Sequence, residues 1–311
     1  MPENTSLNKT AFLFPGQGSQ YVGMGKDWYE SNPKAKEMFA RANEILGFDI
    51  AKICFEGPEE ELRQTAVTQP AIFLHSAVAF TLLDEKRFDA AAGHSLGEYS
   101  ALFAVGALDF EHTLMLVGLR GRLMQNAGDV RRGTMAAVVG LGEKIVEEVC
   151  REASVDGVAQ PANYNSPGQI IISGDVDAVR KAMDLARTRG AKIVKELVVS
   201  GAFHSPLMET AKGELKKAID AAPICDAKVP VYANVTAKPV KSASEIKDAL
   251  IRQLTSPVRW QESVVNMFND GITKFVEIGP GKVLQGLVKR TVSTNDVVGI
   301  DKLNETSVLV K

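Results

Sequence analysis

The segment Gly93-His94-Ser95-Leu96-Gly97 places a serine between two glycines, where an apolar run meets a long segment of helical pattern. This is the pattern of a nucleophile elbow, a sharp turn between a strand and a helix that exposes a serine hydroxyl. Side chains two residues before and two residues after the serine would crowd such a turn, and glycine has none. The turn leaves the Leu96 amide free at a helix N-terminus, where it could stabilise an oxyanion. The sequence therefore predicts Ser95 as a nucleophile.

A serine nucleophile needs a general base, and the chain has four histidines. His75 and His112 lie inside apolar helical segments, where we expect a packed or surface-facing role. His94 adjoins the serine, but consecutive residues around a turn point in different directions, so we expect it to orient or pack. His204 lies in a loop after a predicted strand, where functional side chains collect. His204 is therefore the candidate base.

The third member of a catalytic triad is less evident. In α/β-hydrolase sites the chain order is serine, acid, histidine, and Asp175, Asp177 and Asp184 lie between Ser95 and His204. All three have the positions of helix-start or helix-face residues. A backbone or amide oxygen could orient the imidazole instead, which would make the site a dyad. The residues alone leave both arrangements open.

The glycine-containing segment Phe14-Pro15-Gly16-Gln17-Gly18-Ser19-Gln20 follows an apolar run, as a nucleotide-binding loop would. Its spacing excludes that interpretation, because Tyr21 stands where the third glycine of G-x-G-x-x-G is needed. Asp27 likewise follows Gly25-Lys26 where a P-loop needs serine or threonine. An ordinary turn remains, or a loop that lends a second backbone N–H to an oxyanion hole.

Arg120 lies in the apolar segment 113–124. A lone arginine in such a helix can extend its head group to solvent or cap the helix. If it points into a cavity instead, its guanidinium is suited to bind a carboxylate.

Composition excludes several classes of protein. The 311 residues are 45% hydrophobic. With 36 basic and 38 acidic residues, the chain lacks the excess of positive charge that is typical of nucleic-acid-binding proteins. Residues 1–10 show no secretory signal or transit peptide, and no apolar run is long enough for a bilayer, so we expect a cytoplasmic location. Cys54, Cys150 and Cys225 are odd in number and far apart, which favours buried free thiols over disulfides or zinc.

Strand-like and helical segments alternate, which predicts an α/β fold with a parallel sheet. Strands are expected at 11–14, 88–92 and 275–278. Helices are expected from Asn32-Pro33, from Pro70 through Phe80, after Ser95, after Phe110, after Pro206, over 244–254 and near the C-terminus.

From Gly133 the pattern changes. Strands at 135–139, around Ala162, at 170–172 and at 193–199 enclose helices at 143–153 and 176–188. The order β-α-β-β-α-β is that of a ferredoxin-like module. We therefore predict a small ferredoxin-like subdomain over 132–201, inserted into a larger core formed by 1–131 and 202–311.

Seven motifs in this order resemble those of the malonyl-CoA:acyl carrier protein transacylases, acyltransferases of fatty-acid and polyketide synthesis. The likeness spans nearly the whole chain. The motifs are Phe14-Pro15-Gly16-Gln17-Gly18-Ser19-Gln20, Gly93-His94-Ser95-Leu96-Gly97-Glu98-Tyr99, Arg120-Gly121-Arg122, Asn163-Tyr164-Asn165-Ser166-Pro167-Gly168-Gln169, Gly201-Ala202-Phe203-His204-Ser205, Gln253-Leu254 before Ser256-Pro257-Val258, and Glu277-Ile278-Gly279-Pro280-Gly281.

The resemblance implies an α/β-hydrolase-like core with the ferredoxin-like insertion, and it implies roles for individual residues. These are Ser95 as nucleophile, His204 as base, the Gln253 main-chain carbonyl as the group orienting the imidazole, Arg120 as the partner of the malonyl carboxylate, and the Gln17 and Leu96 amides as the oxyanion hole. His94, Asn163 and Phe203 are expected beside these groups. Phe203 before His204 resembles the loop associated with malonyl rather than methylmalonyl transfer.

The implied reaction is ping-pong transfer of malonyl, through an ester on Ser95, from malonyl-CoA to the phosphopantetheine thiol of holo acyl carrier protein for fatty-acid biosynthesis. The resemblance implies no cofactor or metal and a monomeric enzyme. An acidic carrier protein calls for a basic patch, which could be Arg187, Arg189, Lys192 and Lys195, or Lys282, Lys289 and Arg290. The alternatives are a serine esterase or thioesterase with the same elbow, a discrete polyketide-pathway acyltransferase, and a degenerate acyltransferase kept as a carrier-protein binding module.

Overall fold

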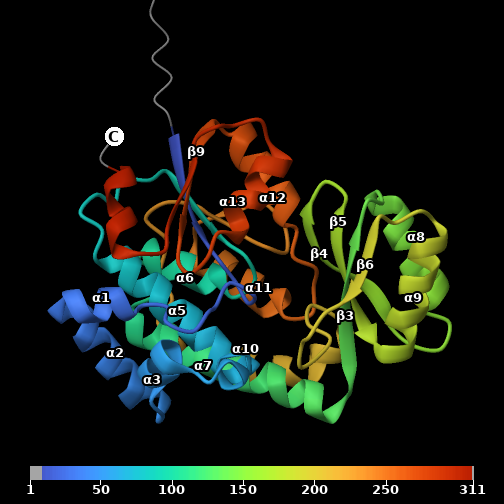
Figure 1. Ribbon diagram of the computed structural model, residues 1–311, viewed down its shortest axis with the longest axis horizontal. Helices are drawn as coiled ribbons and strands as arrows, with labels where there is room; N and C mark the ends of the chain where they lie inside the picture. The colour runs from blue at the N-terminus through green and yellow to red at the C-terminus, as the bar shows by residue number, and fades with distance from the viewer. Residues whose placement is uncertain (1–8, 310–311) are drawn as a thin grey trace, which may run out of the picture.

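The computed structural model describes residues 9–309 and places a six-stranded sheet at the centre of the larger part of the molecule (Figure 1). The strands lie in the order β10-β9-β1-β2-β7-β8, and all neighbours are parallel except β8, which runs antiparallel to β7. The predicted parallel sheet is thus a mixed sheet with one antiparallel edge strand. Its strands are β1 (Lys9–Phe14), β2 (Ala90–Gly93), β7 (Val231–Tyr232), β8 (Pro239–Val240), β9 (Ile272–Ile278) and β10 (Val297–Ile300).

Helices cover both faces of this sheet, because successive side chains of a strand point to opposite faces. In β1, Phe12 and Phe14 pack into the main core, whereas Ala11 and Leu13 pack into a second cluster with α12 and α13. The helices of this part are α1 (Lys26–Ser31), α2 (Pro33–Leu46), α3 (Ile50–Glu56), α4 (Glu59–Leu62), α5 (Thr65–Thr81), α6 (Gly97–Ala104), α7 (Phe110–Val130), α10 (Glu209–Ala221), α11 (Ala243–Gln253), α12 (Trp260–Asn269) and α13 (Val283–Thr291), with short 3₁₀ turns at Pro206–Met208 and Leu303–Leu309.

Local sequence signals predicted the first residue of one helix correctly and that of another wrongly. The α2 helix begins at Pro33, as predicted, and the Asn32 side chain caps it by accepting a hydrogen bond from the Lys34 amide. The α5 helix begins at Thr65 and not at Pro70, so that prediction was wrong. Proline removes only one helical hydrogen bond, and the burial of almost every side chain of α5 offsets that loss.

Residues 133–196 form a second, antiparallel sheet in the order β4-β5-β3-β6, with α8 (Glu143–Ala153) and α9 (Val176–Thr188) on its outer face (Figure 1). Ala136 and Val138 of β3 pack against these two helices, whereas Met135 belongs to the main core. Its strands are β3 (Gly133–Val139), β4 (Ala159–Ser166), β5 (Gln169–Asp175) and β6 (Ile193–Glu196).

The second sheet meets the larger part along β4. The Tyr164 amide donates to the Val258 carbonyl (2.9 Å), and the Val258 amide donates to the Ala162 carbonyl (2.8 Å). Within residues 9–309, no helix has the length and apolarity required to span a lipid bilayer. The prediction that the chain has no targeting signal was made from residues 1–10, and residues 1–8 of these lie outside the described part of the chain.

Candidate active site

The turn between β2 and α6 holds Ser95 in a left-handed conformation, with φ of 52°. A side chain at Gly93 would collide with the backbone of Gly97, and one at Gly97 would collide with the backbone of Phe14. Both positions therefore require glycine. A non-glycine residue at positive φ costs energy and is typical of functional sites. Ser95 therefore has the backbone geometry expected of a nucleophile elbow.

His204 faces the Ser95 hydroxyl, with 2.8 Å between its Nε2 and the serine Oγ. Its Nδ1 lies 2.9 Å from the main-chain carbonyl oxygen of Gln253. Because a carbonyl can only accept a hydrogen bond, Nδ1 carries the ring proton and Nε2 is free to accept the serine proton. Burial, helped by the charge of Arg120, lowers the pKa of His204 to about 3, although the Gln253 carbonyl acts in the opposite direction. The imidazole is therefore neutral near pH 7.

Arg120 extends from α7 into the same site and is 1% exposed. Its Nη2 donates to Ser95 Oγ (3.0 Å) and to Gln253 Oε1 (3.0 Å), and its Nη1 donates to Gln69 Oε1 (2.6 Å). Extension to solvent and helix capping are both excluded. Burial lowers the pKa of Arg120, while the nearby Tyr99 and Glu98 act to raise it; an arginine starts so high that it stays charged at pH 7.

Gln17 and Leu96 line the same cavity as Ser95. Leu96 is the residue before the first turn of α6, where amides lack helical partners. The loop that carries Gln17 passes directly above the elbow, since a Cβ on Gly16 would overlap the His94 carbonyl. Gln17 therefore follows a residue whose backbone is in close contact with the backbone of the elbow.

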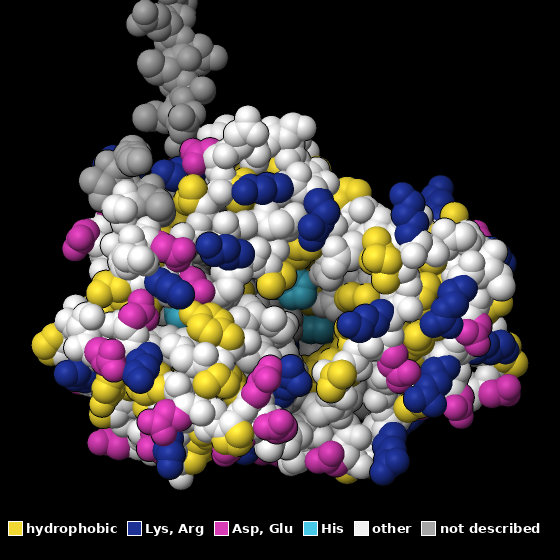
Figure 2. Space-filling model, in the orientation of Figure 1, with side chains coloured by type: hydrophobic (Ala, Val, Ile, Leu, Met, Phe, Trp, Pro, Cys, Tyr) yellow, Lys and Arg dark blue, Asp and Glu magenta, His cyan; other side chains and the backbone are white. Residues whose placement is uncertain are grey.

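A cavity of about 270 Å³ lies between the six-stranded part and the second sheet. Both parts contribute to its wall, and in Figure 2 histidine side chains are visible in a hollow between them, with Lys and Arg side chains nearby. Asn163 and Phe203 line the cavity, as expected. The remaining wall is formed by Gly16, Gln17, Gln69, His94, Ser95, Leu96, Arg120, Met124, Met135, Asn165, Gln169, Ile171, Leu197, Val199, His204, Val283, Leu284, Leu287 and Arg290.

His94, which we expected to orient or pack, contacts residues beside the elbow. Its Nε2 lies 2.8 Å from Asn165 Oδ1 on β4, and its ring lies 5.7 Å from that of Trp260. Burial lowers its pKa, with the Asn165 hydrogen bond opposing the shift. His94 therefore links the elbow to the second sheet, and its Nε2 is bound to Asn165.

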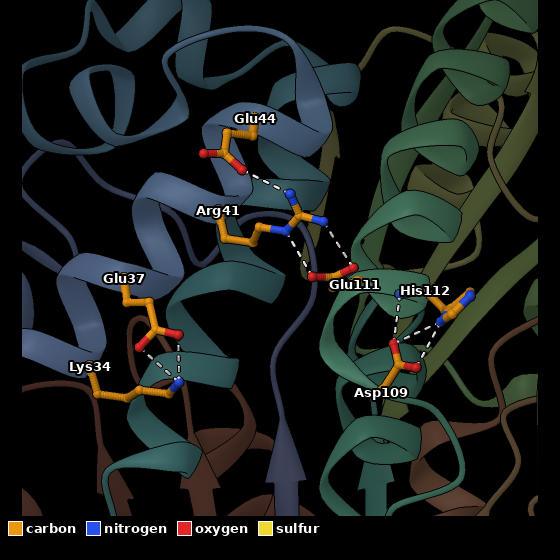
Figure 3. A network of polar contacts seen from close by, with 7 residues as sticks. All are labelled: Lys34, Glu37, Arg41, Glu44, Asp109, Glu111 and His112. Carbon is orange, nitrogen blue, oxygen red and sulfur yellow. Dashed lines mark hydrogen bonds and ion pairs between the residues drawn. The ribbon is translucent and has the colours of Figure 1, made fainter.

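The two other histidines lie elsewhere. His75 is buried, and its Nε2 is 2.8 Å from the main-chain oxygen of Asp301. His112 is on the surface at the start of α7, where its Nδ1 is 2.7 Å from Asp109 Oδ2; Figure 3 shows this pair beside the ion pairs of Arg41. Neither histidine contacts Ser95, as predicted.

The three candidate acids also lie outside the site. Asp175 pairs with Arg131 (2.8 Å) just before α9, Asp177 is in the first turn of α9, and Asp184 pairs with Arg187 (2.6 Å). The group on the His204 ring is instead the carbonyl of Gln253, so the arrangement is a dyad with a backbone oxygen.

Sequence reasoning missed several polar groups that hold this arrangement together. Asn234 Oδ1 accepts from the Ser95 amide (2.7 Å), and Gln160 Nε2 donates to the His204 carbonyl (2.9 Å). Glu98 Oε2 accepts from Gln253 Nε2 (2.8 Å), and Gln69 binds Arg120. Glu98 lay within the elbow motif, but the others are single polar residues with no spacing signal.

Comparison with known proteins gives a consistent result. The family described as acyl transferase domain matches residues 11–307. The chain is 46% identical over 287 residues to a malonyl CoA-acyl carrier protein transacylase of Bacillus subtilis, covering 91% of this chain and 90% of that protein. It aligns with the crystal structure of an acyl carrier protein S-malonyltransferase from Vibrio cholerae with a TM-score of 0.93 and 43% identity, covering 97% of this chain and 100% of that chain.

A further solved structure, of a type II PKS acyl-carrier protein in complex with its malonyl-transacylase, aligns with a TM-score of 0.92 and 39% identity over 97% of this chain and 99% of that chain. The matches cover nearly the whole sequence, and Ser95, Arg120 and His204 all lie within the range 11–307 that the family matches. The chain therefore belongs to the acyl transferase family, with malonyl CoA-acyl carrier protein transacylases among its relatives.

Proposed function

We propose that this protein transfers the malonyl group of malonyl-CoA to the phosphopantetheine thiol of acyl carrier protein, through an ester on Ser95. The observation that carries the proposal is the position of one hydroxyl: Ser95 Oγ is 2.8 Å from the Nε2 of neutral His204 and 3.0 Å from the Nη2 of charged Arg120. A base and a carboxylate-binding group thus meet at one nucleophile.

In the first half-reaction His204 accepts the Ser95 proton as Oγ attacks the thioester carbonyl. The carbonyl oxygen becomes an oxyanion, which the amides of Gln17 and Leu96 stabilise. The C–S bond then breaks, and the proton on His204 passes to the departing CoA sulfur. The thioester carbon is now esterified to Ser95.

The second half-reaction runs in the opposite sense with a different thiol. His204 takes the proton of the pantetheine thiol, the sulfur attacks the serine ester, and Ser95 Oγ leaves and regains the proton. Because a thioester is consumed and a thioester is formed, the transfer needs no redox or energy-supplying partner. We therefore propose that the protein acts without a cofactor or metal.

Arg120 supports a choice of acyl groups that carry a carboxylate. A charge-assisted hydrogen bond contributes about 1.5–3 kcal/mol, and an acetyl group would leave the guanidinium without this partner in a buried site. Phe203, which lines the cavity beside His204, supports malonyl over its branched analogues.

The relatives' names and the carrier-protein complex support a carrier protein as second substrate. Of the two basic groups, Arg187 and Arg189 are engaged by Asp184, Glu148 and Glu152, whereas Arg290 borders the cavity. We therefore propose the set Lys282, Lys289 and Arg290 on and before α13 as the docking patch, although Lys282 also lies 3.5 Å from Glu305.

The architecture proposed is an α/β-hydrolase-like core, 1–131 and 202–311, with a ferredoxin-like subdomain over 132–201. The parallel strand order and the elbow after β2 support the first part, and the order β4-β5-β3-β6 with α8 and α9 on one face supports the second. The cytoplasmic location, the monomeric state and the choice of a fatty-acid carrier protein stay predictions, which fractionation, light scattering and carrier-protein competition would check.

Intact-mass measurement tests the function directly. We expect addition of malonyl-CoA to increase the mass by one malonyl group, and addition of holo carrier protein to move that group to the carrier. The Ser95→Ala variant should acquire no adduct. Release of free malonate without a thiol acceptor would indicate a hydrolase, and an unmodified wild-type protein that still binds the carrier would indicate a binding module.

A further inference from the structure

Glu98 is a fully buried carboxyl in the first turn of α6, three residues after Ser95, and the reaction described above does not use it. One of its oxygens, Oε2, accepts two hydrogen bonds. The donors are the amide of Asn234 (3.1 Å) and Nε2 of Gln253 (2.8 Å). Burying a carboxyl group costs free energy unless the group is hydrogen-bonded, so the residues that bind Glu98 indicate what its burial serves.

Both partners of Glu98 hold the elbow itself. Asn234 Oδ1 accepts from the Ser95 amide (2.7 Å), and its Nδ2 donates to the Gly93 carbonyl (2.7 Å). Gln253 Nε2 donates to the Ser95 carbonyl (2.9 Å). Glu98 is therefore the acceptor shared by the two residues that bind the backbone of the serine on either side.

The carboxamide of Gln253 has only one orientation that satisfies its surroundings. Its Nε2 donates to the Ser95 carbonyl and to Glu98, with Asn234 Oδ1 as a longer third acceptor (3.4 Å), and its Oε1 accepts from Arg120 Nη2 (3.0 Å). A flipped amide would place NH₂ against the guanidinium and an oxygen against two acceptors. Glu98, the acceptor nearest to Nε2, therefore helps to fix which end of Gln253 faces Arg120.

We propose that Glu98 is a positioning residue for acyl selection: by accepting from Gln253 Nε2 and the Asn234 amide, it fixes the Gln253 carboxamide and thereby the guanidinium of Arg120 against the Ser95 hydroxyl. This inference rests on the proposed malonyl transfer. It assigns no contact of Glu98 with the substrate.

The test compares Glu98→Leu with Glu98→Gln. Since both hydrogen bonds fall on one oxygen, the single carbonyl oxygen of glutamine can accept both, whereas leucine accepts neither. We expect Glu98→Leu to lower kcat/KM for malonyl-CoA about 10- to 100-fold, and to lower the malonyl-to-acetyl preference by a similar factor. Glu98→Gln should restore both to within about threefold of the wild type.

Asp301→Leu is the matched control. Asp301 is also a buried carboxyl, but it accepts from the Tyr21 hydroxyl (2.9 Å) and the Gly281 amide (3.2 Å), which do not bind Ser95, His204 or Arg120. Its loss should lower the melting temperature without altering the malonyl-to-acetyl ratio of the folded enzyme. A Glu98→Leu variant that loses stability alone, with an unchanged ratio, would refute the proposal.

A double variant tests whether Glu98 acts through Gln253. All variants are expressed at low temperature, because the competition assays need only a small amount of folded protein. Gln253→Met removes the carboxamide but leaves the carbonyl that binds His204. On this background Glu98→Leu should cause no further change in acyl preference; an equal change on both backgrounds would contradict the route through Gln253. Failure of the wild type to form a malonyl adduct would instead refute the proposed function.

Discussion

Gln253 contacts both His204 and Arg120. Its main-chain oxygen lies 2.9 Å from His204 Nδ1, and its side-chain oxygen accepts a hydrogen bond from Arg120 Nη2 at 3.0 Å. One residue at the end of α11 therefore binds both the imidazole of His204 and the guanidinium of Arg120. Since the two functions use different atoms, substitution of the side chain separates them. A Gln253 variant should retain the neutral Nδ1–H tautomer.

Arg120→Ala tests the carboxylate partner. Loss of a charged hydrogen bond of about 1.5–3 kcal/mol should lower kcat/KM for malonyl-CoA roughly 10- to 150-fold, and should shift acyl preference toward acetyl by a comparable factor. Competition between malonyl-CoA and acetyl-CoA measures the shift. Arg122→Ala, an exposed arginine two residues along the same helix, is the control and should leave the preference unchanged. An unaltered preference in Arg120→Ala would remove this residue from the acyl pocket.

The acid limb of the activity profile tests the state of His204. Its pKa is lowered to about 3, chiefly by burial, so the imidazole stays neutral at all pH values above that range. The value of kcat/KM should therefore change little between pH 8 and pH 5. A histidine of ordinary pKa would lose roughly 30-fold by pH 5. Initial rates in overlapping buffers distinguish the two, and a midpoint near pH 6.5 would contradict the structure.

The elbow could be predicted from the sequence because a sharp turn from strand to helix needs glycine at two nearby positions, here Gly93 and Gly97. The sequence also predicted the β-α-β-β-α-β order of the second sheet, since its elements are regular in period. Strands β7 and β8 are two residues long each and carry no period that could be detected. Their place in the sheet follows from tertiary contacts alone.

The polar network was less predictable for a similar reason. Asn234 and Gln69 reach the site from segments far from Ser95 in the chain, and nothing in their neighbours signals a buried role. Arg120 was ambiguous between a surface and a cavity position, because a helix segment that is apolar on most sides gives no direction to a single charge. In the fold α7 packs against α5, and Arg120 is directed toward Gln69 of that helix and toward Ser95.

The stability of the protein should report the burial of Glu98. Burial raises the pKa of its carboxyl from 4.5 to about 7, against the opposing hydrogen bonds from Gln253 and Asn234. The native state then keeps a proton that the unfolded state releases, so stability contributed at this site falls as pH rises from about 4.5 to 7. The wild type should lose roughly 3 kcal/mol relative to Glu98→Gln across this window.

Urea unfolding of both proteins at pH 5 and pH 8 measures this difference. Glu277, another buried carboxyl with a pKa raised to about 7, is present in both proteins, so its contribution cancels. Equal pH dependence in the two proteins would mean that Glu98 ionises at its ordinary pKa in the folded state.

Two glycine-to-alanine variants should have effects of opposite sign. The Cβ of Gly93→Ala would overlap the backbone of Gly97, which cannot move without displacing α6, so we expect a loss of at least about 3 kcal/mol in the free energy of unfolding. Gly213, within the exposed face of α10, has no heavy atom within 4 Å of an added Cβ. Gly213→Ala should therefore stabilise the protein by about 0.5–1 kcal/mol, since alanine restricts the unfolded chain and favours the helix. Chemical denaturation of the two variants and the wild type measures both changes in the free energy of unfolding. A loss well below 3 kcal/mol in Gly93→Ala would show that the elbow can relax, so that the conformation of Ser95 does not depend on glycine at position 93.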